Sequence, residues 1–119
     1  MLNILVEEGL DTAIFRCEGS LVLGEEGALL CPALRQRERT ILLDLSLVDR
    51  IDAAGEGALI ALQAAGIYLK IADPSKAVAD VLKLTHVDSL FEIVNLAESD
   101  ADTTRLPTVA FPAQVPAIA

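Results

Sequence analysis

The chain has 119 residues, 53% of them hydrophobic, and a formal net charge of -9 at pH 7. This length supports one hydrophobic core and therefore predicts a single folded domain. Because 18 acidic residues stand against nine basic ones, nucleic acid and anionic membrane surfaces are excluded as expected partners.

Membrane insertion, secretion and thiol chemistry are also not expected. The longest apolar stretch, residues 55–71, is interrupted by charged and polar residues, so it does not predict a membrane span. The N-terminus lacks the pattern of a secretory signal, and we therefore expect a cytoplasmic protein. Cys17 and Cys31 have no metal-like spacing, which indicates two buried thiols in a reducing compartment and no disulfide.

A β-hairpin is predicted at the start of the chain. Residues 2–8 and 12–18 are short apolar-rich segments typical of strands, and Gly9-Leu10-Asp11 between them favours a tight turn. The two strands should therefore pair with each other.

The next segment, residues 21–37, has a helical pattern that places Leu30 and Leu34 on one face. Pro32 lies inside this segment. Because proline lacks a backbone N–H and clashes with the preceding turn, we expect a kinked or broken helix there.

A strand, helix and strand follow in the middle of the chain. Residues 41–45 are apolar apart from one aspartate, which predicts a central strand covered on both faces of a parallel sheet. We expect a turn around Asp49 and Arg50, a helix from Asp52 to near Gly66, and a second buried strand over residues 67–72.

The last elements are shorter. Ser75 is a plausible N-cap for a helix whose apolar face carries Val78, Val81 and Leu82. Residues 90–94 predict a short edge strand or a turn of helix. Residues 97–119 are acidic and polar at first, then contain three prolines without periodicity, which indicates a flexible tail. The expected organisation is a domain over residues 1–96 followed by this tail.

Two motifs resemble the STAS family, the family of anti-sigma-factor antagonists. They are LDLSLVDRIDAAGEG at residues 43–57 and DPSKAVADVLKLT at residues 73–85, and residues 87–93 resemble the closing segment of the family. Together with the hairpin, the resemblance covers about residues 1–95. It implies an α/β fold with a mixed sheet of four to five strands, flanked by helices and begun by an N-terminal β-hairpin.

The resemblance also implies a function. In that family, a kinase-type anti-sigma factor phosphorylates a serine just before the glycine of the first motif, and the unphosphorylated antagonist binds that kinase. Here this position is Ala54, which has no hydroxyl, so the chain is expected to bind an anti-sigma factor or serine kinase without that switch. The implied partner-binding residues are Asp52, Ala53, Ala54, Gly55, Glu56, Gly57 and Ile60.

The residues of this segment also have structural interpretations. Asp52 can cap the helix with its carboxylate, while Gly55 and Gly57 allow close approach of another backbone. Helical spacing places Ala53, Gly57, Ile60 and Ala64 opposite the expected core face, where they would form a flat apolar patch edged by Glu56 and Gln63.

His86, the only histidine, stands where the family often has glycine after its last helix. A left-handed helix-end residue is expected at this position, and we assign the histidine no catalytic role.

Three alternatives remain open. In the first, phosphorylation has moved to Ser46, Ser75 or another hydroxyl, although Ser46 and Ser75 both favour structural roles. The chain can instead be a scaffold or regulatory subunit of a transporter or stress-signalling assembly, with nucleotide binding as a variant. The third, a small enzyme or nucleotide-binding domain, is not expected, because phosphate loops, metal-ligand clusters and nucleophile elbows are missing from the sequence. Asp44, Asp49 and Asp52 are candidates for gathering around a cation, but Asp44 in a central strand favours hydrogen bonds with loop amides, and no cofactor or metal is assigned.

Overall fold

A five-stranded sheet forms the frame of the structure, a computed structural model in which residues 1–96 are described. The strands lie side by side in chain order, the first pair antiparallel and the others parallel. Their bounds are Leu2–Glu8 (β1), Thr12–Leu21 (β2), Thr40–Ile51 (β3), Leu69–Ala72 (β4) and Glu92–Val94 (β5). The predicted mixed sheet and N-terminal hairpin are therefore confirmed. The flexible tail predicted over residues 97–119 lies outside the described residues.

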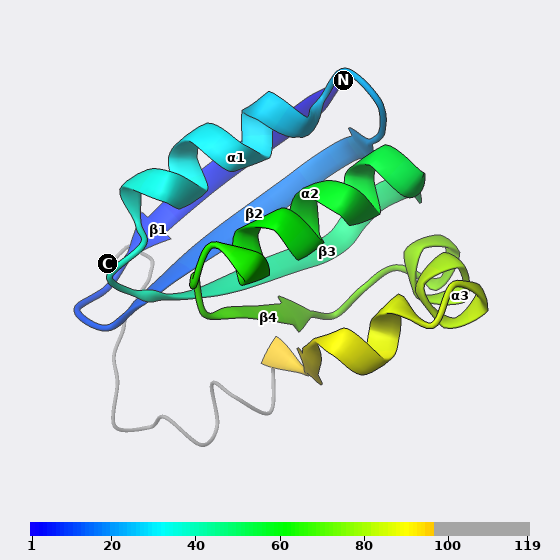
Figure 1. Cartoon of the computed structure of the whole chain (residues 1–119). Helices are drawn as coiled ribbons and strands as arrows, with labels where there is room; N and C mark the ends of the chain where they lie inside the picture. The colour runs from blue at the N-terminus through cyan, green and yellow to red at the C-terminus, as the bar shows by residue number, and fades with distance from the viewer. Residues whose placement is uncertain (97–119) are drawn as a thin grey trace.

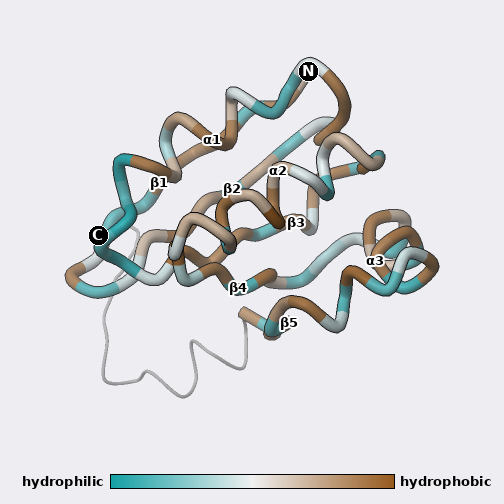
Figure 2. The backbone as a smooth tube through the Cα atoms, in the orientation of Figure 1, coloured by the Kyte–Doolittle hydropathy of each residue, from teal (hydrophilic) through white to brown (hydrophobic). Residues whose placement is uncertain are grey.

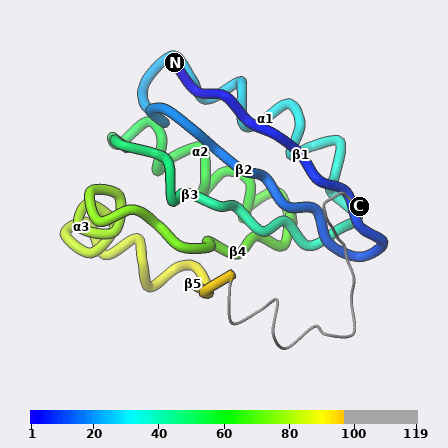
Figure 3. Tube along the Cα trace, turned by 180° about the vertical axis from the view of Figure 1, so that it is seen from behind, coloured from blue at the N-terminus to red at the C-terminus, as the bar shows by residue number. Residues whose placement is uncertain are grey.

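The helices α1 (Glu26–Arg35) and α2 (Ala53–Ala64) cover one face of this sheet (Figure 1). From behind, the strands lie in front of both helices (Figure 3). The third helix, α3 (Lys76–Leu84), begins beside the end of β3, and a short 3-10 helix, Val87–Leu90, leads from it to β5. Over residues 1–96 there is no helix with the length and apolar character that a bilayer crossing requires.

The N-terminus of α3 is fixed to the central strand by Ser75. Its backbone N–H donates to the Leu45 carbonyl at 3.2 Å, and its hydroxyl donates to the Val48 carbonyl at 2.6 Å. The Ser75 oxygen also accepts a hydrogen bond from the Val78 backbone N–H at 3.3 Å. The predicted N-cap is confirmed, and it sets where α3 lies relative to β3.

The hydrophobic core lies between the sheet and the two helices. Phe15, Leu43 and Ile71, from three neighbouring strands, and Leu29 and Leu59, from the helices, are fully buried. Figure 2 shows hydrophobic stretches along the central strands and α2. Full burial of such a side chain contributes about 1.5–3 kcal/mol of stabilisation. Burial in this layer is therefore the main interaction that holds the helices on the sheet.

The central position predicted for residues 41–45 is confirmed, but the turn predicted around Asp49 and Arg50 is wrong. Strand β3 continues to Ile51, because β2 also continues to Leu21 and pairs with it beyond two register shifts. Ser20 lies opposite Arg50 in this extension. The irregular pairing hides the alternation of buried and exposed residues that identifies a strand in sequence.

The prediction for the first helix is partly wrong. Helix α1 begins at Glu26 and not at residue 21, and it passes through Pro32 without a break. Its buried residues are Leu29 and Ala33, whereas Leu34 is 46% exposed. Because Leu29 and Ala33 are both fully buried on either side of Pro32, packing holds this short helix together despite the missing backbone hydrogen bond.

Two single-residue expectations have opposite outcomes. His86 does adopt the left-handed conformation expected after α3, with φ of 63°. The expectation of two buried thiols is wrong for one of them, because Cys17 is buried in β2 but Cys31 is exposed on α1. The helix turns Leu29 and Ala33 inward, which leaves the side chain at position 31 facing solvent.

The two thiols should therefore differ sharply in reactivity. Burial, and secondarily the negative charge of Asp44, raises the pKa of the Cys17 thiol to about 12, so almost no thiolate forms there at neutral pH. We expect a disulfide reagent such as DTNB to titrate one thiol in the native protein and the second only after denaturation in urea. A Cys31→Ser variant should show no rapid titration; rapid labelling of this variant would contradict the buried position of Cys17.

Candidate functional site

The carboxylate of Asp52 links the start of α2 to the segment between β2 and α1, where its contact residue Leu23 lies 29 residues earlier in the chain. One oxygen accepts a hydrogen bond from the Gly55 backbone N–H at 2.9 Å, and the other accepts one from the Leu23 backbone N–H at 3.1 Å. The predicted N-cap of α2 is thus confirmed. The contact with Leu23, on the segment between β2 and α1, could not be seen in the sequence.

These donors also keep the carboxylate charged. The Gly55 N–H, followed by the Leu23 N–H, holds the pKa of Asp52 below its ordinary value. Because the folded-state pKa is lower than the unfolded one, the stabilisation is complete at neutral pH and is lost as pH falls through the folded pKa.

Gly55 is buried where α2 approaches the end of β2. A Cβ atom at this position would lie 2.1 Å from the Leu21 carbonyl oxygen and 2.9 Å from Cγ1 of Ile51. The close approach expected of this glycine is real, but it is made within the molecule. Gly57, by contrast, is exposed and has open space where a side chain would project.

Glu56 does not edge an exposed patch as predicted, because it points inward. It is 6% exposed, and its carboxylate accepts a hydrogen bond from the Thr85 hydroxyl at 2.6 Å. This contact joins the first turn of α2 to the C-terminal end of α3. The sequence could not reveal it, since the two residues are 29 positions apart.

The outer face of α2 is exposed and uncharged. Ala53, Gly57, Ile60 and Ala64 are all exposed, with Ile60 at 37%, and Ala54 is half-buried. Glu56 is the only charged residue of this helix and is turned away from the surface. Gln63 is exposed, and its side-chain amide donates a hydrogen bond to the Leu90 carbonyl at 2.6 Å.

The three aspartates that were candidates for a cation site are each engaged elsewhere. Asp44 accepts from the Ser46 backbone N–H at 3.0 Å and pairs with Arg16 at 3.2 Å. Asp49 accepts from the Ser20 hydroxyl at 2.7 Å, and Asp52 caps α2. No group of three potential metal ligands occurs within residues 1–96.

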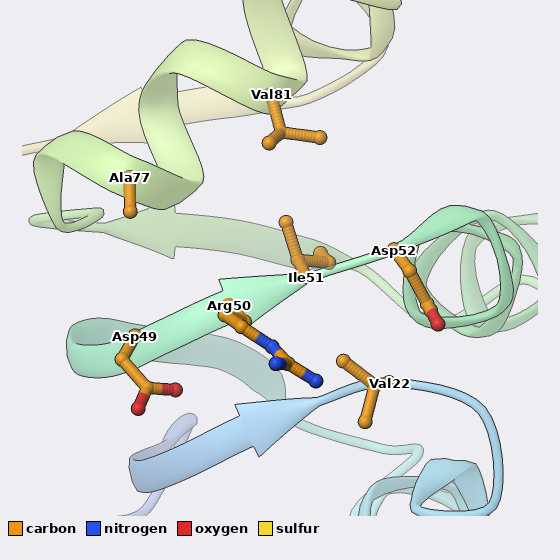
Figure 4. Close-up of a pocket in the computed structure, with 7 residues that line it drawn as sticks. All are labelled: Val22, Asp49, Arg50, Ile51, Asp52, Ala77 and Val81. Atoms are coloured by element: carbon orange, nitrogen blue, oxygen red, sulfur yellow. The ribbon is translucent and has the colours of Figure 1, made fainter.

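A pocket of about 250 Å³ opens beside the N-terminus of α2 (Figure 4). It shares Asp52 with the predicted site and adds residues outside that site. The lining comes from residues at or just after the ends of β2 and β3 and from α3, and comprises Val22, Asp49, Arg50, Ile51, Asp52, Ala77 and Val81. The pocket could not be anticipated from a turn at Asp49 and Arg50, because it forms only when those residues belong to the extended end of β3.

The comparisons with known proteins agree with this fold. The STAS domain family model matches residues 3–101, and the chain therefore belongs to the STAS domain family. Among solved structures, one described as an anti-sigma factor antagonist from Thermotoga maritima has 19% identity and a TM-score of 0.71, with 87% of this chain and 95% of that chain covered.

Two further structures are similar. The anti-sigma factor antagonist SpoIIAA in its unphosphorylated form shares 15% identity at a TM-score of 0.68, covering 89% of this chain and 100% of its own. An anti-sigma factor antagonist from Mycobacterium paratuberculosis shares 16% identity at a TM-score of 0.66, covering 89% of this chain and 96% of its own. At these identities the likeness establishes the shared fold.

The two glycines of this segment should respond in opposite ways to alanine. Gly55→Ala forces a methyl group against the Leu21 carbonyl oxygen and should lower the free energy of unfolding by about 1–3 kcal/mol. Gly57→Ala should raise it by about 0.5–1 kcal/mol, because the position is open and helical. Urea denaturation followed by circular dichroism measures both; equal stability of the two variants would disprove the close contact at Gly55.

Proposed function

We propose that this chain is a protein-interaction module that binds a kinase-type anti-sigma factor, or a related signalling partner, in the cytoplasm. The single observation that carries the proposal is the outer face of α2, which exposes Ile60 among alanine and glycine and presents no charged side chain. Most exposed helices of soluble proteins carry charged residues on their solvent face. An uncharged helix face in a chain of net charge -9 is suited to being covered by another protein.

The geometry of the N-terminus of α2 supports the same proposal. Asp52 and Gly55 fix the first turn of the helix against the end of β2, so the face is presented on a rigid element. A preorganised surface loses little conformational freedom on binding. We assign contact with the partner to the exposed or half-exposed members of the predicted set, namely Asp52, Ala53, Ala54, Gly57 and Ile60, and a supporting role to Gly55 and Glu56.

Ala54 makes this surface insensitive to the phosphorylation that the resemblance implies. A phosphoserine here would add about -1.5 to -2 charges and three acceptor oxygens at the start of α2. The methyl group of Ala54 provides no site for such a change. The proposed binding is therefore not switched by phosphorylation at position 54. The fraction of the chain that is bound is set by the concentration of the partner.

The role of the α2 face can be tested by introducing a charge at Ile60. We expect Ile60→Asp to weaken the binding of a purified kinase-type anti-sigma factor by about tenfold or more, because a carboxylate would be desolvated in an apolar interface. Leu10→Asp is the matched control, since Leu10 is 94% exposed at the turn between β1 and β2. Isothermal titration calorimetry measures both affinities; unchanged binding by Ile60→Asp would refute the proposed face.

The absence of a switch at position 54 gives a second test. Incubated with the partner kinase and radiolabelled ATP, the wild-type chain should incorporate no phosphate, whereas Ala54→Ser should gain one phosphoserine at residue 54. Phosphopeptide mapping identifies the modified position. Phosphate on Ser46 or Ser75 of the wild-type chain would show instead that regulation has moved to another hydroxyl.

A further inference from the structure

The pocket beside α2 has an apolar interior. Ile51 is 7% exposed at the end of β3 and faces Val81 of α3 across the pocket, with Val22 at its lower side (Figure 4). Small-molecule sites usually enclose about 300–1,000 Å³. A volume of about 250 Å³ is below this range and suits one inserted aliphatic side chain better than a cofactor or nucleotide.

The charged side chains around the pocket differ in whether they already have a hydrogen-bond or ion-pair partner. Asp52 accepts hydrogen bonds from two backbone N–H groups, and Asp49 accepts one from the Ser20 hydroxyl. Arg50 is exposed, and its guanidinium has no hydrogen bond or ion pair with any other residue of the described chain, 1–96. The pocket therefore presents one unpaired cation next to an apolar interior, with its two carboxylates already engaged.

We infer that this pocket receives a segment of a protein partner in which an aliphatic side chain lies next to a carboxylate. The aliphatic group would insert between Ile51 and Val81, and the carboxylate would form a bidentate pair with Arg50. Charge complementarity selects this occupant, because an acidic group satisfies the one unpaired charge at the pocket. The overall charge of -9 would otherwise favour a basic partner.

The inference rests on the proposed function, since it identifies the chemistry of the partner segment. Asp52 belongs both to the pocket lining and to the N-cap of α2, so a single partner can cover the α2 face and fill the pocket. The α2 face would then supply an uncharged contact, and the pocket would supply specificity for a neighbouring aliphatic and acidic pair.

A dipeptide titration tests the pocket without knowledge of the partner. We expect N-acetyl-Ile-Asp-amide, added up to about 10 mM, to shift the NMR signals of Ile51 and Val81, whereas the Ile-Asn and Gly-Asp analogues bind more weakly. Arg50→Gln should weaken binding of the Ile-Asp peptide about threefold, as expected for one exposed ion pair. Arg37→Gln, which removes an exposed cation at the end of the molecule beyond α1, should leave it unchanged.

Absence of shifts at Ile51 and Val81, or equal binding of the Ile-Asp and Ile-Asn peptides, would overturn the inference. Binding to the purified anti-sigma factor separates it from the proposed function. If Ile60→Asp abolishes binding while Arg50→Glu binds as tightly as the wild type, the docking function stands and the pocket assignment fails. If the dipeptide binds at the pocket but Ile60→Asp binds the anti-sigma factor normally, the pocket stands and the proposed α2 face fails.

Discussion

One carboxylate determines how the candidate surface is built. Asp52 accepts from the backbone N–H groups of Gly55 and Leu23, and so it fixes the start of α2 to the segment that leaves β2. An N-cap alone would position only the helix. Because this carboxylate has two donors on separate segments, it also holds the segment after β2 beside the helix start, and it lines the pocket there.

The close packing of α2 follows from that constraint. With the helix start fixed, Gly55 lies against the Leu21 carbonyl, where no larger residue fits without displacement. The same close packing turns Glu56 toward Thr85 and away from solvent. The one charged residue of α2 is therefore absent from the surface, and the outer face of the helix is left without charge.

Much of the fold could be predicted because local patterns determine it. The hairpin, the central strand, the Ser75 cap and the left-handed residue His86 each depend on residue types within a few positions of one another. The strand extension through Asp49 and Arg50 could not be predicted in this way, since it depends on pairing with β2 across a bulged register. The same limit applies to Glu56, whose inward orientation depends on Thr85 of another helix.

The candidate site divides along the same line. The segment from Asp52 to Ile60 could be proposed from the sequence because it lies in one continuous motif. The pocket is assembled from three separate elements, and no local pattern indicates it. Its single unpaired cation, Arg50, lies four residues before Ala54, where the resemblance implies a modifiable serine. A fixed positive charge cannot be reversed as a phosphate can, so under the proposed function this chain recognises its partner through permanent complementarity. The fraction of this chain that is bound then depends on the amount and affinity of the partner and not on a covalent change in the chain itself.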